Sequence, residues 1–175
     1  MKKTGYLTLG AVMSALSVTT MLMSYVPTLT YSVPALAGMF VMVVVIEAGV
    51  KWAVCSYAAA AVISMLIAEP EAALFFLFLF GCYPIIKVPL ERIKFKPLKY
   101  LLKLVYFNAS VLAVYFAFTA ITGTSMLGGE VKQYVMAAIL VLANFVFLVY
   151  DYALGGVSAW YIVKLHNKVS KLIKR

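Results

Sequence analysis

Long apolar segments separated by short charged ones make up almost the whole chain. Between Lys3 and Glu47 there is no charged residue, and Asp151 is the single charge in the last apolar segment. The other charge-free runs cover residues 52–68, 72–86 and 104–129. About 20 apolar residues in a helix cross a lipid bilayer, whereas barrel strands are shorter and alternate in polarity. This pattern therefore predicts membrane-spanning helices rather than strands.

The first apolar run is too long for one crossing, so we expect a turn near its middle. Its centre reads "YVPTLTYSVPA", in which Pro27 and Pro34 bracket a polar stretch. Proline removes a backbone donor and restricts the residue before it, so a turn fits there better than helix. A basic interfacial loop is expected at 87–103. The chain is thus predicted to be one all-α domain, residues 1–175, a compact bundle of six transmembrane helices near 6–26, 34–48, 52–68, 72–87, 104–123 and 133–163.

Composition points to the same fold class. Hydrophobic residues make up 65% of the sequence and charged residues 12%, and the mean hydropathy is +1.02. A typical soluble domain is about half apolar and about a quarter charged. A soluble fold of 175 residues cannot bury so much apolar surface, so we expect an integral membrane protein.

Basic residues predict the orientation of the bundle. If the N-terminus is cytoplasmic, fourteen of the 15 lysines and arginines fall in cytoplasmic segments, and only Lys132 lies outside. This bias fits the positive-inside rule and predicts a multi-pass protein of the cell membrane with both termini in the cytoplasm. Membrane lipid is then the expected partner of the basic segments, and the net charge of +9 does not call for nucleic acid. The apolar stretch from Tyr6 to Tyr25 exceeds the core of a signal peptide, so we expect no cleavage.

Residues with reactive side chains are few. Cys55 and Cys82 are both expected near the cytoplasmic side, where thiols stay reduced, and His166 is the one histidine. This set is too small for a metal site, and the sequence contains no P-loop, paired-glutamate protease pattern or redox motif. We therefore expect a protein that is not an enzyme and that carries no metal or other cofactor.

Asp151 is the one charged residue in the interior of a predicted span, since Glu47 and Lys87 lie at span ends. A carboxylate inside a bilayer costs about 2.5–3.5 kcal/mol, so it should face protein or water. Tyr150 and Tyr152 flank it and their hydroxyls could cap it, while Asn144 shares its helix face. Asp151 then acts as a buried polar contact between helices, as part of a proton relay, or as a ligand contact. A relay is the weakest of the three, because no second acid or histidine stands in line with it.

Polar and aromatic residues also gather in the connections on the outer side, at 25–34, 68–72 ("AEPEA") and 122–134. The first connection is uncharged and stiffened by proline, which suits a lid over a pocket. A mostly apolar cavity with a few aimed polar groups is typical of small-molecule sites, although tyrosine is enriched at membrane interfaces in any case. The candidate ligand-binding residues are Tyr25, Thr28, Tyr31, Glu69, Tyr115, Thr119, Tyr134 and Asn144.

The first apolar segment contains two rows of small residues. In "GAVMSALS", residues 10–17, Gly10 and Ser14 lie four apart, as do Ala11 and Ala15. Small residues at this spacing let another helix approach closely. That helix belongs either to this chain or to a separate protein.

With this motif, its size and its predicted topology, the chain resembles the S components, the substrate-capturing subunits of energy-coupling factor (ECF) vitamin transporters. Ala11 and Ala15 match the family's Ala-xxx-Ala positions. The resemblance implies that this face docks on a transmembrane coupling subunit driven by two ATPases. It also implies that the loop at 27–33 is a gate, and that a vitamin or another small micronutrient is captured at the outer face.

Two other functions stay open at this point. A structural membrane protein similar to the MreD family of cell-shape proteins would receive a partner helix and carry no ligand. A self-contained channel or proton-coupled carrier would use Asp151. An enclosed outer cavity favours ligand capture, whereas a filled core favours a scaffold.

Overall fold

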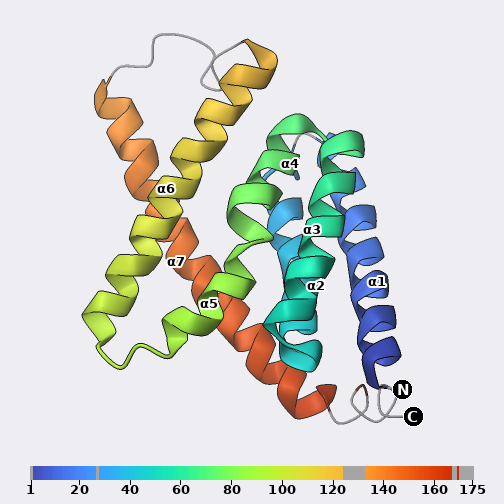
Figure 1. Ribbon diagram of the computed structural model, residues 1–175. Coiled ribbons are helices and arrows are strands. Elements are labelled where there is room, and N and C mark those ends of the chain that lie inside the picture. The colour runs from blue at the N-terminus through green and yellow to red at the C-terminus, as the bar shows by residue number, and fades with distance from the viewer. Residues whose placement is uncertain (1, 27, 124–132, 167–168, 170–175) are drawn as a thin grey trace.

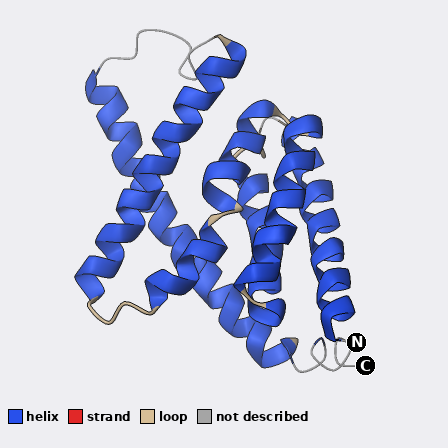
Figure 2. Ribbon diagram, in the orientation of Figure 1, coloured by secondary structure: helices blue, strands red, loops and turns tan. Residues whose placement is uncertain are grey.

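The computed structural model describes residues 2–26, 28–123, 133–166 and 169 (Figure 1). Within this part of the chain the regular elements are all helices and no strand occurs (Figure 2). The all-α fold predicted from the sequence is therefore confirmed. In chain order the elements are α1 (Lys2–Met21), η1 (Leu22–Tyr25), α2 (Ser32–Ala48), α3 (Val50–Ile67), α4 (Pro70–Phe75), η2 (Phe76–Phe80), α5 (Tyr83–Glu91), α6 (Lys96–Thr122) and α7 (Gln133–Lys164).

Five helical segments of the described chain are long and apolar enough to cross a membrane, which makes this a bundle of the membrane type. Helix α2 is also apolar but has only 17 residues. Large apolar side chains cover the outside of the bundle; Leu66, for example, is 80% exposed. Such exposure suits lipid, which is as apolar as leucine itself. The five segments are Lys3–Tyr25, Val50–Ile67, Pro70–Glu91, Lys96–Thr122 and Ala138–Lys164.

Successive apolar segments run in alternate directions, with α4, η2 and α5 forming one segment, so the connections between segments fall at two ends of the bundle (Figure 1). At one end α1 begins, α2 turns into α3, α5 leads to α6, and α7 ends. We call this the basic end, because it holds Lys3, Lys51, Arg92, Lys94, Lys96 and Lys164. The opposite end, which we call the far end, holds η1, Glu69 and Glu71. The described basic residues therefore lie toward one end of the bundle.

Helix α1 packs against α2 and α3 through small residues. The Ser14 hydroxyl lies 2.7 Å from that of Ser56 on α3, and Ser56 donates to the carbonyl of Gly10 at 2.9 Å. Ser17 donates to the carbonyl of Ala37 on α2 at 3.1 Å. Hydroxyls reach a neighbouring backbone only where helices approach closely, which small residues permit. The row that contains Gly10 and Ser14 therefore meets a helix of this same chain.

The fourth apolar segment is broken rather than regular. Residues Phe76–Phe80 form a π-helical turn, and the N–H of Gly81 donates back to the first carbonyl of that turn at 2.8 Å. A π-turn interrupts the regular ladder, so some carbonyls need other donors. The hydroxyl of Tyr106 on α6 donates to one carbonyl of the turn at 2.8 Å, and the hydroxyl of Tyr57 on α3 donates to another. The chain then turns into α5, which carries Lys87 toward α7.

Two apolar clusters fill the bundle. The first lies among α1, α2, α3, α4 and the start of η2, and the second joins α2, η2 and α5 to α6 and α7. Helices α6 and α7 cross each other, and α7 continues across the bundle toward the end of α2 (Figure 1). There the hydroxyl of Tyr161 donates to the buried Glu47 carboxylate at 3.0 Å, and His166 lies at the same distance from it. The buried residues of the first cluster include Met21, Val41, Ala60 and Phe76, and those of the second Tyr83, Phe107, Phe147 and Leu154.

The basic loop expected at 87–103 is mostly helical, which corrects the prediction. Helix α5 continues to Glu91, and α6 begins at Lys96 with Pro97 in its first turn, a position that suits proline. Lys87 and Lys103 are 7% and 1% exposed. These lysines do not need water at the membrane surface, because acidic residues of the bundle bind them.

Gly38 on α2 allows the closest approach between this helix and η2. A Cβ at this position would overlap the carbonyl oxygen of Phe80 and lie 3.1 Å from the Tyr150 hydroxyl. We expect Gly38→Ala to lower the free energy of unfolding in detergent by about 1–3 kcal/mol, because overpacking outweighs the helix propensity of alanine. The matched control is Gly10→Ala, whose Cβ meets Ser56 at an ordinary 3.8 Å and should not destabilise. Equal stability of the two variants would contradict the packing described.

Candidate functional site

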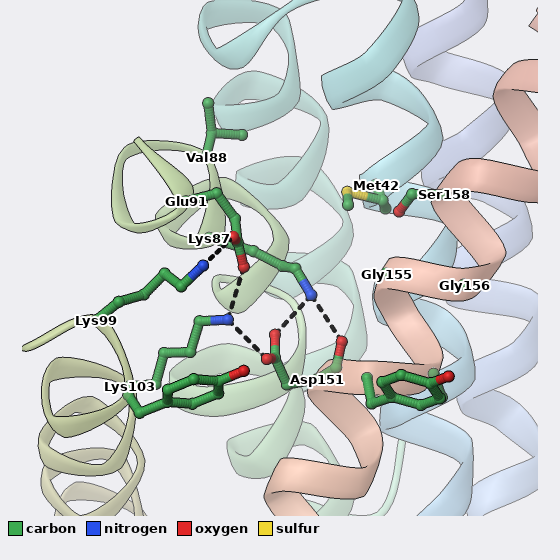
Figure 3. Close-up of a pocket in the computed structure, with 13 residues that line it drawn as sticks. Met42, Lys87, Val88, Glu91, Lys99, Lys103, Asp151, Gly155, Gly156 and Ser158 are labelled. Atoms are coloured by element: carbon green, nitrogen blue, oxygen red, sulfur yellow. Dashed lines mark hydrogen bonds and ion pairs between the residues drawn. The ribbon is translucent and has the colours of Figure 1, made fainter. Parts of the chain in front are cut away.

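Asp151 lies in the middle of α7 and is only 7% exposed. Three donors from two other helices bind its carboxylate. Tyr83 and Lys87 of α5 both reach Oδ1 at 2.5 Å, and Lys103 of α6 reaches Oδ2 at 2.6 Å. Lys87 also donates to the backbone carbonyl of Asp151 at 2.7 Å (Figure 3). One carboxylate therefore ties α5, α6 and α7 together.

Glu91 extends this network toward the surface. Its carboxylate accepts one bond from Lys103 at 2.7 Å and another from Lys99 at 2.9 Å (Figure 3). Its side chain is 42% exposed, whereas that of Lys103 is 2% exposed. The network thus runs from a buried ion pair at Asp151 to a partly solvated pair at the basic end. We call its five members, Lys87, Asp151, Lys103, Glu91 and Lys99, the charge network.

Aromatic rings surround the buried part of the charge network. The ring of Tyr83 stacks on Tyr106 at 5.7 Å and meets Phe147 edge-on at 5.0 Å. These rings exclude water from one side of Asp151 and lower the local dielectric. Attraction between opposite charges is stronger there than in water, and the penalty for an unpaired charge is larger.

A pocket of about 680 Å³ opens beside the charge network. Its charged wall comes from α5 and α6, and its other wall is a stretch of α7 that contains Gly155 and Gly156 (Figure 3). A Cβ at Gly156 would meet no atom within 4 Å, so this wall is open at that point. The volume lies within the range of small-molecule sites, about 300–1,000 Å³. The lining residues are Met42, Lys87, Val88, Glu91, Lys99, Tyr100, Lys103, Asp151, Tyr152, Ala153, Gly155, Gly156 and Ser158.

The partners of Asp151 differ from those expected. Tyr150 and Tyr152 were predicted to cap it, but the buried hydroxyl of Tyr150 has no hydrogen-bond partner among the described residues, and Tyr152 is 85% exposed. Neighbours in sequence point to other faces of a helix, which is why neither tyrosine reaches the acid. Its actual partners are Lys87 and Lys103, which the sequence places in an interfacial loop at the membrane surface.

At the far end, three of the predicted ligand-binding residues take part in hydrogen bonds between two connections of the chain. Tyr31 donates to Glu71 at 2.6 Å, and Tyr25 donates to the carbonyl of Ile67 at 3.1 Å. The backbone N–H of Glu69 donates to Ser24 at 3.2 Å. These bonds hold the connection between α1 and α2 against that between α3 and α4. Another bond, from Thr30 to Glu69 at 3.1 Å, acts in the same way, whereas Thr28 is exposed.

The other predicted ligand-binding residues lie elsewhere. Thr119 donates to the carbonyl of Tyr115 within α6 at 2.9 Å. Asn144 on α7 exchanges hydrogen bonds with Asn108 on α6, at 2.9 and 3.2 Å. The side chain of Tyr134 lies outside the described residues. The described members of the set therefore form two groups, one on the α1–α4 side and one on α6 and α7, and the pocket beside Asp151 contains none of them.

The two rows of small residues on α1 face in different directions. Gly10 and Ser14 are buried against α3, whereas Ala11 and Ala15 are exposed. The exposed row is thus left largely uncovered within the described part of the chain. Comparisons of the chain with family models, with curated proteins and with solved structures find no match.

Removing the acid at the centre of the charge network should destabilise the fold. We expect Asp151→Asn to cost about 3–5 kcal/mol of unfolding free energy, because two buried ammonium groups lose their shared carboxylate. Glu91→Gln, at a partly exposed pair, should cost less than about 1 kcal/mol. The measurement is a denaturant titration in detergent micelles.

A second variant separates charge from shape in that experiment. Asp151→Asn combined with Lys87→Met removes one of the uncompensated ammonium groups and should recover part of the lost stability. If the two substitutions are independent, the loss of stability in the double variant equals the sum of the losses in the two single variants. That additive result would show that Asp151 and Lys87 are not coupled.

Tyr31 gives a test of the contacts at the far end. Its pKa is raised to about 12 by the hydrogen bond to Glu71, by partial burial, and by the charges of Glu71 and Glu69. The neutral hydroxyl is the donor, so the contact is complete below the ordinary pKa of 10.0 and is lost as the pH rises through about 12. Glu71→Gln should return the pKa toward 10.0, and Glu69→Gln should change it less. An NMR titration of ¹³C-labelled tyrosine, assigned with Tyr31→Phe, measures this; the same pKa in wild type and Glu71→Gln would contradict the contact.

Proposed function

We propose that this protein captures a small molecule, a vitamin or another micronutrient, at the outer face of the cell membrane and delivers it inward. In this proposal it is the substrate-specific subunit of an ECF-type importer. A separate transmembrane coupling subunit and two ATPases supply the work, since the sequence has no P-loop of its own. The basic end faces the cytoplasm in accordance with the positive-inside rule, with both termini inside.

The exposed row of Ala11 and Ala15 carries this proposal. The neighbouring row, Gly10 and Ser14, is already used against α3. Packing within the described chain accounts for the buried row but gives no reason for a second smooth face on the outside of α1. Small residues favour close contact with another helix over contact with lipid. A coupling subunit that meets α1 supplies such a helix.

The segment between α1 and α2 supports the proposal at the other end of the molecule. Hydroxyl-to-carboxylate bonds from Thr30 and Tyr31 hold it against Glu69 and Glu71. A segment held by a few polar contacts opens at small energetic cost, as a gate must. The substrate would enter beneath this segment, beside Tyr25 and Glu69.

A structural role like that of the MreD proteins is the second candidate, and the place of the pocket favours it. The pocket beside Asp151 belongs to the basic end rather than to the far end, where capture from outside would need one. A scaffold would hold a cytoplasmic complex at the basic end and would carry no substrate. The two functions differ in the proteins that accompany the chain.

Purification of the tagged protein from membranes of its own host tests the proposal. We expect the wild type to bring a coupling subunit and two ATPases, identified by mass spectrometry. Ala11→Trp with Ala15→Trp should reduce their recovery at least tenfold, because bulky side chains block the docking face. The control is Leu112→Trp, which places the same side chain at a 56% exposed site on α6.

Native mass spectrometry of the same sample addresses the substrate. A bound small molecule should be present in the wild type and retained in the variant Ala11→Trp with Ala15→Trp. Recovery of a cell-shape complex without ATPases would support the scaffold instead. Equal recovery of ATPases with all variants would remove Ala11 and Ala15 from the interface.

A further inference from the structure

We propose that the pocket beside Asp151 binds the phosphate group of an anionic ligand at the basic end. This inference does not depend on the proposed transport function, since it concerns the opposite end of the molecule from the gate. The shared chemistry is a phosphate that enters between α5, α6 and α7. It reaches the bundle either on a lipid headgroup or as free phosphate.

The charges of the pocket favour an anion. Three ammonium groups, those of Lys87, Lys99 and Lys103, line it together with the two carboxylates of Glu91 and Asp151. The charge network therefore carries one more positive than negative charge. Lys87 and Lys103 are nearly buried, so bulk solvent screens this excess poorly. An anionic ligand would supply the missing negative charge.

The hydrogen-bond donors of the pocket are suited to phosphate. An ammonium group has three N–H donors. Within the described chain Lys87 and Lys103 donate two bonds each and Lys99 donates one, so each lysine keeps at least one N–H for another acceptor. Phosphate oxygens accept several such bonds at once and are common partners of lysine.

The opposite wall leaves room for the ligand. Gly155 and Gly156 present only backbone to the pocket, and a Cβ at Gly156 would meet nothing within 4 Å. Val88 and Tyr100 add apolar surface at the rim, and the Tyr100 ring lies under Lys103, 5.7 Å from its Nζ. This combination of a charged wall, an open glycine wall and an apolar rim resembles the basic pockets between helices that hold lipid headgroups.

The test uses delipidated wild-type protein in detergent and two probes. Native mass spectrometry counts molecules of added phosphatidylglycerol, with phosphatidylcholine as the comparison lipid. Thermal unfolding in increasing inorganic phosphate, against chloride at equal ionic strength, reports free phosphate. We expect saturable binding of at least one of the two probes, with phosphatidylcholine binding more weakly.

Two variants address the pocket while leaving Asp151 and its two buried lysines intact. Lys99→Gln removes a partly exposed donor and should weaken binding roughly tenfold, as the loss of one charged hydrogen bond does. Gly156→Leu fills the open wall without a change of charge and should weaken binding at least as much. The controls are Lys94→Gln, an exposed lysine outside the pocket, and Val157→Leu, the neighbour of Gly156 that does not line it.

Each outcome decides the proposal. Selective binding of phosphatidylglycerol alone, lost in both pocket variants, supports the site and assigns it to a lipid headgroup. Saturable stabilisation by inorganic phosphate, lost in the same variants, supports the site and assigns it to a free phosphorylated ligand. Binding of neither probe overturns the proposal, and so does equal binding by the pocket variants and their controls.

Discussion

The buried carboxylate of Asp151 is the interaction on which the second half of the structure depends. An isolated charge in a medium of low dielectric costs many kcal/mol, so it persists only with partners in place. Here the partners come from α5 and α6, at 2.5 Å for Lys87 and 2.6 Å for Lys103. Helix α7 brings a negative charge, and α5 and α6 bring the positive charges that compensate it. Their positions are therefore coupled, and the pocket between them exists only while that coupling holds.

The first half of the structure relies on a different interaction. Helices α1, α2 and α3 meet through glycine, alanine and serine, and serine hydroxyls join their backbones at distances such as 2.9 Å between Ser56 and the Gly10 carbonyl. In a lipid environment close packing and such hydrogen bonds replace the hydrophobic effect as the source of helix association. The broken fourth segment, with its π-turn at Phe76–Phe80, links this tightly packed half to the charged half. The two halves thus offer two distinct surfaces, a smooth face on α1 and a basic pocket beside α7.

The sequence predicts the fold class because charges mark the points at which the chain leaves the apolar phase. The all-α fold class follows from the charge-free runs. The same rule fails at 87–103, where Lys87 and Lys103 turn inward. A pattern of single residues assumes that every lysine seeks water, whereas these two find a carboxylate more than 45 residues away in the chain.

The site was harder to predict for the same reason. Asp151 was recognised as a residue that must face protein or water, but its partners depend on a long-range arrangement that no local spacing reveals. The available signal was the four-residue spacing of two pairs, Lys87 with Glu91 and Lys99 with Lys103. Residues at this spacing lie on one face of a helix, so each pair presents its two charged groups in the same direction. The predicted outer residues divide into two groups because Tyr115, Thr119 and Asn144 lie on α6 and α7. At the far end these two helices lie apart from the connection that contains Tyr31 (Figure 1).

A single spectrum tests the central claim directly, because Asp151 is the only aspartate in the sequence. Solid-state NMR of the protein in lipid bilayers, with ¹³C-labelled aspartate and ¹⁵N-labelled lysine, detects carboxyl carbons that lie close to ammonium nitrogens. The account predicts two cross-peaks from the Asp151 carboxyl carbon, of which Lys87→Gln removes one and Lys103→Gln the other. A carboxyl carbon with no lysine cross-peak would contradict the ion pairs of Asp151 and the pocket that depends on them.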